Sequence, residues 1–258
     1  MAELIFIGTS SGKTSLNRFH SSFIISTLNY NLLIDAGDGV SKALLMQQVS
    51  YDVIDGILFS HLHPDHYTGL PALIVQMKMI ERKKTLDVFI NSELADVIRN
   101  FLIQSYLFPD RIGFEIKYHR LTDNVKFKIN DDISFIPRRN SHLDSVSKLE
   151  DYESRSFSSS SFLLSVDDKN VHYTSDVGEK NDLLLFRDNK IDCLISEVTH
   201  ISPEDIITAA DKSNLSGQII LTHINDDDLN SLQKYILELP ASFKERIVIA
   251  SDGLKIKL

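Results

Sequence analysis

The sequence predicts an α/β fold, and two features of its 258 residues support that prediction. Short apolar runs that are typical of strands alternate with segments that have the 3.6-residue periodicity of helices. Histidine and aspartate residues follow several of the apolar runs directly, where the predicted strands end. The length allows one α/β domain or two smaller ones, and the 43% hydrophobic content is ordinary for a soluble globular protein with a full core.

The predicted elements follow one another along the whole chain. Predicted strands occupy residues 4–7, 23–26, 32–34, 54–59, 86–90, 114–118, 125–129, 133–137, 162–166, 171–174, 191–196, 219–223, 247–249 and 254–256. Predicted helices occupy residues 40–48, 71–83, 92–107 with Ser92 as cap, and 226–237, and a further helix begins at Pro203 after the N-cap Ser202. Asp252 and Gly253 predict a hairpin turn between the last two strands.

Composition excludes several classes of protein. The net charge of -9 argues against a basic surface that coats nucleic acid, although a few local basic residues could still hold one phosphate. Cys193 is the single cysteine, so an intramolecular disulfide is impossible, and its apolar surroundings favour a small buried residue over a reactive thiol. The first apolar run is too short for a signal peptide, and no stretch approaches membrane-spanning length, so we expect a cytoplasmic protein without a membrane partner.

The strongest chemical signal is a cluster of four potential metal ligands after the apolar run 54–59. His61, His63, Asp65 and His66 fall within six residues. In an extended segment, residues two apart point to the same side, so His61 and His63 can bind one ion. If a helix follows, Asp65 and His66 turn to the other side and can hold a second ion. Imidazole and carboxylate ligands suit zinc, with manganese or iron as alternatives.

The pattern His-x-His-x-Asp-His after a strand resembles the signature of the metallo-β-lactamase superfamily. The resemblance implies an αββα sandwich, in which two mixed sheets carry helices on their outer faces, as a single domain over residues 1–258. It implies two divalent metal ions, zinc before manganese or iron, with these ligands: His61, His63 and His142 on one ion, Asp65, His66 and His223 on the other, and Asp176 bridging both. It also implies that Asp35 supports the metal loop by hydrogen bonding. A second interpretation is a Gly-Asp turn that caps the helix at 40–48, and the two can hold together.

Two further features resemble the ribonuclease Z-like branch of that superfamily. Residues 8–14 look like a phosphate-binding P-loop, but one residue is missing between the glycines and no helix follows, so we interpret them as a loop that crosses the active-site face. Glu197 and Thr199 resemble a Glu-x-Thr element of that branch, in which a glutamate and a histidine donate a proton to the leaving oxygen. This implies Glu197 and His200 as catalytic residues, with His200 as general acid or, alternatively, as a plain loop histidine. Asp65 can orient or deprotonate the attacking water as well as bind metal.

Other polar residues receive simpler interpretations. His119 is interpreted as a surface or packing residue, and His172, inside a strand, as structural. Arg138 and Arg139 form a solvated turn or contact a phosphate. Residues 143–161 are acidic and then serine-rich without periodicity, which is typical of a surface loop; the alternative is a cover over the substrate.

The leading functional expectation is a dinuclear metallo-hydrolase that cleaves a small phosphodiester, such as a cyclic nucleotide, through metal-bound hydroxide. The same fold hosts β-lactam, thioester, phosphodiester and redox chemistry, so the alternatives are a ribonuclease Z-type endonuclease that processes transfer-RNA 3′ ends, and a thioester or lactone hydrolase. A metal-stabilised binding module is a different class, and the complete ligand set argues against it. The acidic charge and the lack of a basic, Gly/Pro-rich insertion argue against RNA as the first choice of partner. A homodimer is implied by resemblance only.

Overall fold

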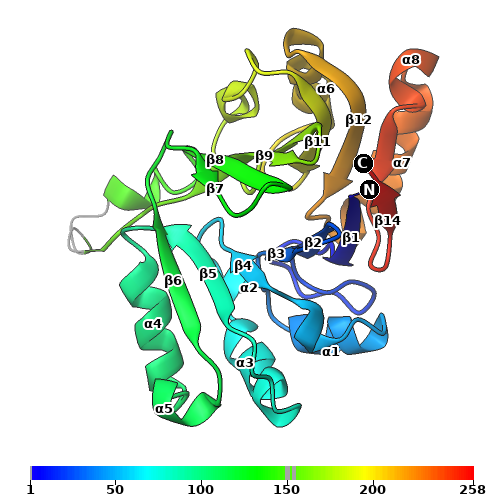
Figure 1. The fold of residues 1–258 in the computed structure, drawn as a ribbon. Helices are drawn as coiled ribbons and strands as arrows, with labels where there is room; N and C mark the ends of the chain where they lie inside the picture. The colour runs from blue at the N-terminus through cyan, green and yellow to red at the C-terminus, as the bar shows by residue number, and fades with distance from the viewer. Residues whose placement is uncertain (1, 149–151, 153–154) are drawn as a thin grey trace. The chain divides into compact units, whose positions relative to one another are not determined.

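Two seven-stranded mixed sheets organise the chain (Figure 1). The computed structural model describes residues 2–148, 152 and 155–258. The chain divides into unit 1, which comprises Met1–Thr122 and Ser251–Lys257, and unit 2, which comprises Asp123–Ala250 and Leu258. The predicted α/β class with two mixed sheets and helices is confirmed. The expectation of a single domain over the whole chain stays a prediction.

Unit 1 contains a sheet that is antiparallel at one end and parallel at the other. In spatial order its strands are β14 (Lys255–Lys257), β1 (Glu3–Gly8), β2 (Ser22–Ser26), β3 (Asn31–Ile34), β4 (Gly56–Leu58), β5 (Leu86–Asn91) and β6 (Ile116–Leu121). Strands β3 to β6 pair in parallel. Its helical segments are α1 (Val40–Met46), η1 (Tyr51–Val53), α2 (Pro64–Tyr67), α3 (Leu70–Met79), α4 (Ala95–Gln104) and α5 (Pro109–Ile112). Parallel pairing brings the carboxyl ends of β3 and β4 to one edge, and the residues after them meet there.

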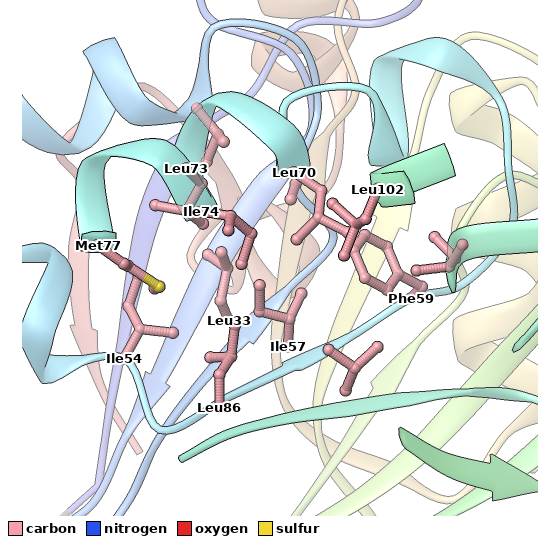
Figure 2. Close-up of a cluster of buried hydrophobic side chains, with 14 of the residues drawn as sticks. Leu33, Ile54, Ile57, Phe59, Leu70, Leu73, Ile74, Met77, Leu86 and Leu102 are labelled. Carbon is pink, nitrogen blue, oxygen red and sulfur yellow. The ribbon is translucent and has the colours of Figure 1, made fainter. Parts of the chain in front are cut away.

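The core of unit 1 lies between this sheet and α3. Figure 2 shows Leu73, Ile74 and Met77 of α3 packed toward the strand residues Leu33 and Ile57, and all five side chains are fully buried. Each large apolar side chain buried in this way contributes roughly 1.5–3 kcal/mol relative to an exposed one. The packing therefore fixes the position of β4, which ends immediately before the histidine cluster.

Unit 2 contains the second mixed sheet. In spatial order its strands are β13 (Ile247–Ile249), β12 (Leu215–Thr222), β11 (Ile191–Glu197), β10 (Lys169–Tyr173), β9 (Ser160–Val166), β8 (Ile133–Arg139) and β7 (Phe127–Lys128). Strands β10 to β13 pair in parallel, and β7 to β10 pair antiparallel. Its helical segments are η2 (Val146–Lys148), η4 (Lys180–Leu184), α6 (Pro203–Lys212), η5 (Asp226–Asp228), α7 (Leu229–Glu238) and α8 (Ala241–Lys244). Buried Leu194, Ile219 and Leu221 of the sheet share one cluster with Ile206 of α6 and Leu232 of α7.

The predicted hairpin between the last two strands is wrong. Strand β13 pairs with β12 in unit 2, whereas β14 pairs with β1 in unit 1. Asp252 instead accepts hydrogen bonds from Thr9 Oγ1 and from Phe19 N, both at 2.7 Å. The turn at Asp252 and Gly253 thus holds the loop that follows β1. Two short apolar segments separated by a turn pattern carry no information about which sheet each will join.

Several predicted helix ends also differ from the structure. Ser92 is not the cap of α4, because Asn91 Oδ1 accepts a hydrogen bond from Glu93 N in a turn and the helix begins only at Ala95. Helix α3 ends at Met79 rather than residue 83, and Glu81 adopts a left-handed conformation with φ of 57°. The predicted Gly-Asp turn is present before α1, closed by a hydrogen bond from Val40 N to Gly37 O at 3.1 Å; the N-cap residue is Gly39, with φ of 78° and no side-chain cap hydrogen bond. The cap of α6 is confirmed, since Ser202 Oγ accepts a hydrogen bond from Asp205 N at 3.1 Å.

Two single-residue interpretations are confirmed by burial. Cys193 is a buried thiol, and burial raises its pKa to about 12, so the thiol stays protonated and unreactive. His172 lies inside β10, 1% exposed, with its ring edge-on to Phe186 at a centroid distance of 5.1 Å. Burial, followed by the charge of Arg138, lowers the pKa of His172 to about 3. Within the described part of the chain, no helix is both long and hydrophobic enough to cross a bilayer.

The buried His172 predicts a specific pH dependence of stability. Below pH 6.5 the unfolded chain protonates His172 while the folded chain does not, so this residue lowers the free energy of unfolding as pH falls toward 3, by about 1.4 kcal/mol per pH unit. The variant His172→Phe removes that loss. We expect the stability difference between variant and wild type to shift by about 2 kcal/mol in favour of the variant between pH 7.5 and pH 5, measured by urea unfolding. Parallel pH profiles for the two proteins would contradict this account.

Candidate functional site

In unit 1, the four predicted ligands after β4 form one cluster. His61 and His66 are fully buried, and the ring centroid of His61 lies 4.7 Å from that of His63 and 4.2 Å from that of His66. Helix α2 begins at Pro64, so Asp65 and His66 lie in its first turn, with 3.6 Å between Asp65 Oδ2 and His66 Nε2. The extended-then-helical path predicted from the sequence is confirmed, and it brings three imidazoles and a carboxylate together.

Asp35 holds this cluster from behind. Its fully buried carboxylate accepts hydrogen bonds from the backbone N–H of Ser60 at 2.8 Å, from Ser60 Oγ at 2.8 Å, and from Nδ1 of His66 at 2.9 Å. The contact with Nδ1 fixes the ring orientation and leaves Nε2 as the nitrogen of His66 that can bind a metal. The predicted supporting role of Asp35 by hydrogen bonding is confirmed.

The glycine-rich turn after β1 is a loop and not a nucleotide P-loop. It runs from β1 to β2 without an intervening helix, and an isolated bridge joins Ser10 to His20. The guanidinium of Arg18 donates to Thr9 Oγ1 at 2.6 Å. A Cβ atom on Gly12 would lie 3.3 Å from Asp65 Oδ2, so the loop passes directly beside a predicted ligand. The P-loop interpretation fails because the helix N-terminus that would bind phosphate is missing from this described segment.

In unit 2, the carboxylate of Asp176 lies between two predicted histidine ligands. Asp176 follows β10 and is 2% exposed. Its Oδ2 is 3.7 Å from His142 Nε2, and its Oδ1 is 3.4 Å from His223 Nε2. His142 follows β8 and His223 follows β12, as predicted. One oxygen directed at each histidine is the arrangement that a bridging carboxylate requires.

Glu197 and His200 form a local pair. Glu197 Oε2 accepts the backbone N–H groups of Thr199 at 2.6 Å and His200 at 2.8 Å, and its Oε1 lies 3.2 Å from Nδ1 of His200. The two residues of the pair stand only three positions apart in the sequence. Glu197 is 1% exposed, whereas the His200 side chain is 38% exposed, and its ring lies 5.7 Å from that of His223. A buried carboxylate thus orients an accessible imidazole beside the Asp176 cluster.

Two residues that the sequence interpretation missed hold the loops of this cluster. The side-chain amide of Asn140 donates to the carbonyl oxygen of Asp176 at 2.9 Å, and its Oδ1 accepts the backbone N–H of His142 at 3.3 Å. The carboxylate of buried Asp182 accepts three hydrogen bonds: from Ser141 N at 3.1 Å, from Ser141 Oγ at 2.7 Å and from Gly178 N at 2.9 Å. The segments that carry His142 and Asp176 are therefore tied to each other. Asn140 stands two residues before a predicted ligand, which is a weak signal, and nothing in the sequence marks Asp182.

Arg138, Arg139 and His119 make packing contacts and ion pairs. The guanidinium of Arg138 stacks over Phe186 at 4.6 Å and donates to the carbonyl oxygen of Leu185, while exposed Arg139 pairs with Asp144 at 2.8 Å. These contacts fit packing and a solvated turn, and they give no support to the phosphate alternative. His119 is a packing residue as predicted: its Nε2 lies 2.6 Å from Asp87 Oδ1 and its ring stacks on Phe89.

The predicted loop 143–161 is only partly described. It includes η2 and a run of buried serines at 158–161, of which the last two begin β9. Residues 149–151 and 153–154 lie outside the described residues. A role of this loop as a cover over the substrate stays a prediction.

Known protein structures share this fold. The structure of the metallo-β-lactamase fold protein YhfI from Bacillus subtilis matches with a TM-score of 0.73 and 19% identity, covering 99% of this chain and 98% of that one. Human tRNase Z, short form, matches with a TM-score of 0.73 and 18% identity, covering 99% and 98%. Ribonuclease Z of Pyrococcus furiosus is 30% identical over 128 residues, which is 50% of this chain and 41% of the relative. The match to this curated relative thus spans about two fifths of its length.

The structure has the metallo-β-lactamase fold of these neighbours, and half of the chain is similar in sequence to ribonuclease Z, in agreement with the resemblance seen in the sequence. The profile of the family described as "Anti-Pycsar protein Apyc1" matches residues 2–249. The chain belongs to this family.

The hydrogen bonds of Asp182 predict a stability effect. In Asp182→Ala, the backbone N–H groups of Ser141, Gly178 and Glu179 lose their common acceptor in a buried position, so we expect the free energy of unfolding to fall by about 2–3 kcal/mol. The matched control is Asp188→Ala, because the Asp188 side chain is 94% exposed and its loss should change stability by less than about 0.5 kcal/mol. Urea unfolding measures both. Equal stability of the two variants would show that Asp182 does not hold these loops.

Proposed function

We propose that this protein is a dinuclear metal-dependent phosphodiesterase whose substrate is a small phosphodiester such as a cyclic nucleotide. One observation carries the proposal: each unit holds buried histidine and aspartate side chains where its parallel strands end. The proposed ligands are His61, His63 and His142 for one ion, Asp65, His66 and His223 for the other, and Asp176 for both.

The donor types fit divalent zinc, with manganese or iron as alternatives. Imidazole nitrogens and carboxylate oxygens make up the whole proposed set, and the orienting contact of Asp35 on His66 is typical of metal-binding histidines. Two bound ions would supply Lewis acidity, which lowers the pKa of a water and neutralises charge on the phosphoryl oxygens. The protein itself would orient the attacking water through Asp65.

His200 is the proposed general acid. Glu197 lies 3.2 Å from Nδ1 of His200, so the ring presents Nε2 to a leaving oxygen, and the carboxylate stabilises the protonated imidazole. Nδ1 of His200 lies 3.9 Å from Asp176 Oδ2, which puts the ring within reach of a substrate bound at that carboxylate. Sugar alkoxides are poor leaving groups and need this proton, whereas p-nitrophenolate does not.

The acidic net charge of the protein favours a small substrate over a polyanion such as RNA. The net charge of -9 lacks the electrostatic footprint that binding a polyanion requires, and Arg138 and Arg139 are engaged with Phe186 and Asp144. A second candidate, transfer-RNA 3′ processing, is favoured by the 30% identity to a protein named ribonuclease Z over half of this chain. A homodimer and a cytoplasmic location stay predictions.

The substrate class can be tested directly with a panel. The purified protein, loaded with zinc or manganese, is assayed on bis(p-nitrophenyl) phosphate, on 3′,5′-cyclic nucleotides and on an RNA with a precursor transfer-RNA 3′ trailer. We expect hydrolysis of the cyclic nucleotides and an intact trailer. His63→Ala should lower kcat at least about 100-fold because it removes a metal ligand. His119→Ala is the matched histidine control, since His119 contacts Asp87 and Phe89.

The variant His200→Ala separates the chemical alternatives. Loss of a general acid should slow cyclic-nucleotide hydrolysis about 100-fold or more, while cleavage of bis(p-nitrophenyl) phosphate stays within a few-fold. Endonucleolytic cleavage of the trailer would support the ribonuclease Z alternative instead. Inactivity on every phosphodiester by a protein that retains metal would contradict both candidates and favour a thioester or lactone hydrolase, for which His200 should matter little.

A further inference from the structure

A cavity of about 430 Å³ in unit 2 opens beside His200. It lies between the loop that follows β11 and helix α7, and its volume is within the range of small-molecule sites. His200 is therefore both a wall of this cavity and a neighbour of the Asp176 cluster. A ligand in the cavity would therefore contact the proposed proton donor.

The walls of the cavity combine apolar and acidic side chains. Ile201 and Leu232 supply aliphatic surface, and Tyr235 supplies a half-buried ring. Glu204 and Asp228 supply carboxylates. Burial and the charge of Glu204 raise the pKa of Tyr235, so its hydroxyl stays a hydrogen-bond donor at neutral pH. The cavity therefore offers a ring to stack on and several acceptor oxygens.

This lining selects one class of ligand. Among the described residues that form the walls there is no lysine or arginine, and two carboxylates would repel a phosphate group. A flat heterocycle with N–H donors fits both features, because its face packs on Tyr235 and its amino group donates to a carboxylate. The phosphate of the same molecule would lie outside the cavity, beyond His200.

We propose that this cavity binds the nucleoside part of the substrate, with Tyr235 under the base and Glu204 and Asp228 accepting hydrogen bonds from an exocyclic amino group. The proposal rests on the proposed function. With the base in the cavity, the cyclic phosphate would lie on the Asp176 side of His200. Hydrolysis would add the oxygen of water to phosphorus and break one P–O bond to the ribose, and His200 would protonate the departing ribose oxygen. The site predicts a preference for bases that carry an amino group.

The test compares substrates with and without a base. Tyr235→Ala should raise KM for cyclic AMP about 10-fold with little change in kcat, while Tyr235→Phe, which keeps the ring, stays near wild type. Both variants should cleave 1-deoxyribose 3′,5′-cyclic phosphate, which has no base, like wild type. The control Tyr106→Ala removes a tyrosine that is 81% exposed in unit 1 and should change nothing.

The role of the carboxylates is tested by base identity. Wild type should prefer cyclic AMP to cyclic IMP, which lacks the amino group, and the double variant Glu204→Gln/Asp228→Asn should lose that preference. The proposal would be overturned if Tyr235→Ala had the same KM for cyclic AMP as wild type. It would also be overturned if the double variant kept the preference for cyclic AMP over cyclic IMP.

A binding measurement separates this proposal from the proposed function. Calorimetric titration with adenosine should show binding to wild type and Tyr106→Ala and at least about 10-fold weaker binding to Tyr235→Ala. Absence of adenosine binding by wild type would overturn the proposal even if cyclic nucleotides are hydrolysed. Adenosine binding that depends on Tyr235, in a protein that hydrolyses no cyclic nucleotide, would support the cavity as a nucleoside site and overturn the phosphodiesterase.

Discussion

The buried carboxylate of Asp176 is the constraint on which the site in unit 2 depends. A negative charge that is 2% exposed is strongly unfavourable without a compensating cation, and the neighbours of Asp176 are imidazoles 3.4 and 3.7 Å away. A divalent cation held by the same imidazole and carboxylate groups would offset that charge. The loops that carry Asp176 and His142 are fixed by Asn140 and Asp182, so the carboxylate is held in position at the strand end.

The two units share one arrangement, in which a buried carboxylate contacts a histidine ring near the ends of parallel strands. In each unit, parallel strands bring their carboxyl ends to one edge, and a second buried carboxylate orients an imidazole there. Asp35 accepts from Nδ1 of His66 in unit 1, and Glu197 pairs with Nδ1 of His200 in unit 2. Because a carboxylate on Nδ1 fixes the tautomer, Nε2 of each ring is available for its task, which we assign to metal binding for His66 and to proton donation for His200.

Sequence patterns predicted that histidine and aspartate residues follow the strands and that Asp35 supports one of these loops, but they missed Asn140 and Asp182. The proximity of His61, His63 and His66 could be predicted because these residues lie close together after one strand, and such a pattern is local. Asp182 could not be found, since its partners at Ser141 and Gly178 come together only through the folded loops. The turn at Asp252 was misread for the related reason that sheet membership of β13 and β14 is decided by distant pairing partners. Local chemistry is visible in one sequence, and long-range pairing is not.

The most direct test of the central claim is the metal content of the protein. After exhaustive dialysis of zinc-loaded protein, mass spectrometry of the metal should find about two zinc ions per chain in wild type, in keeping with seven imidazole and carboxylate ligands of which Asp176 is shared. Asp176→Ala, checked for native circular dichroism, should retain one ion or fewer. Wild-type protein that retains no metal, or a variant with the same metal content as wild type, would contradict the account.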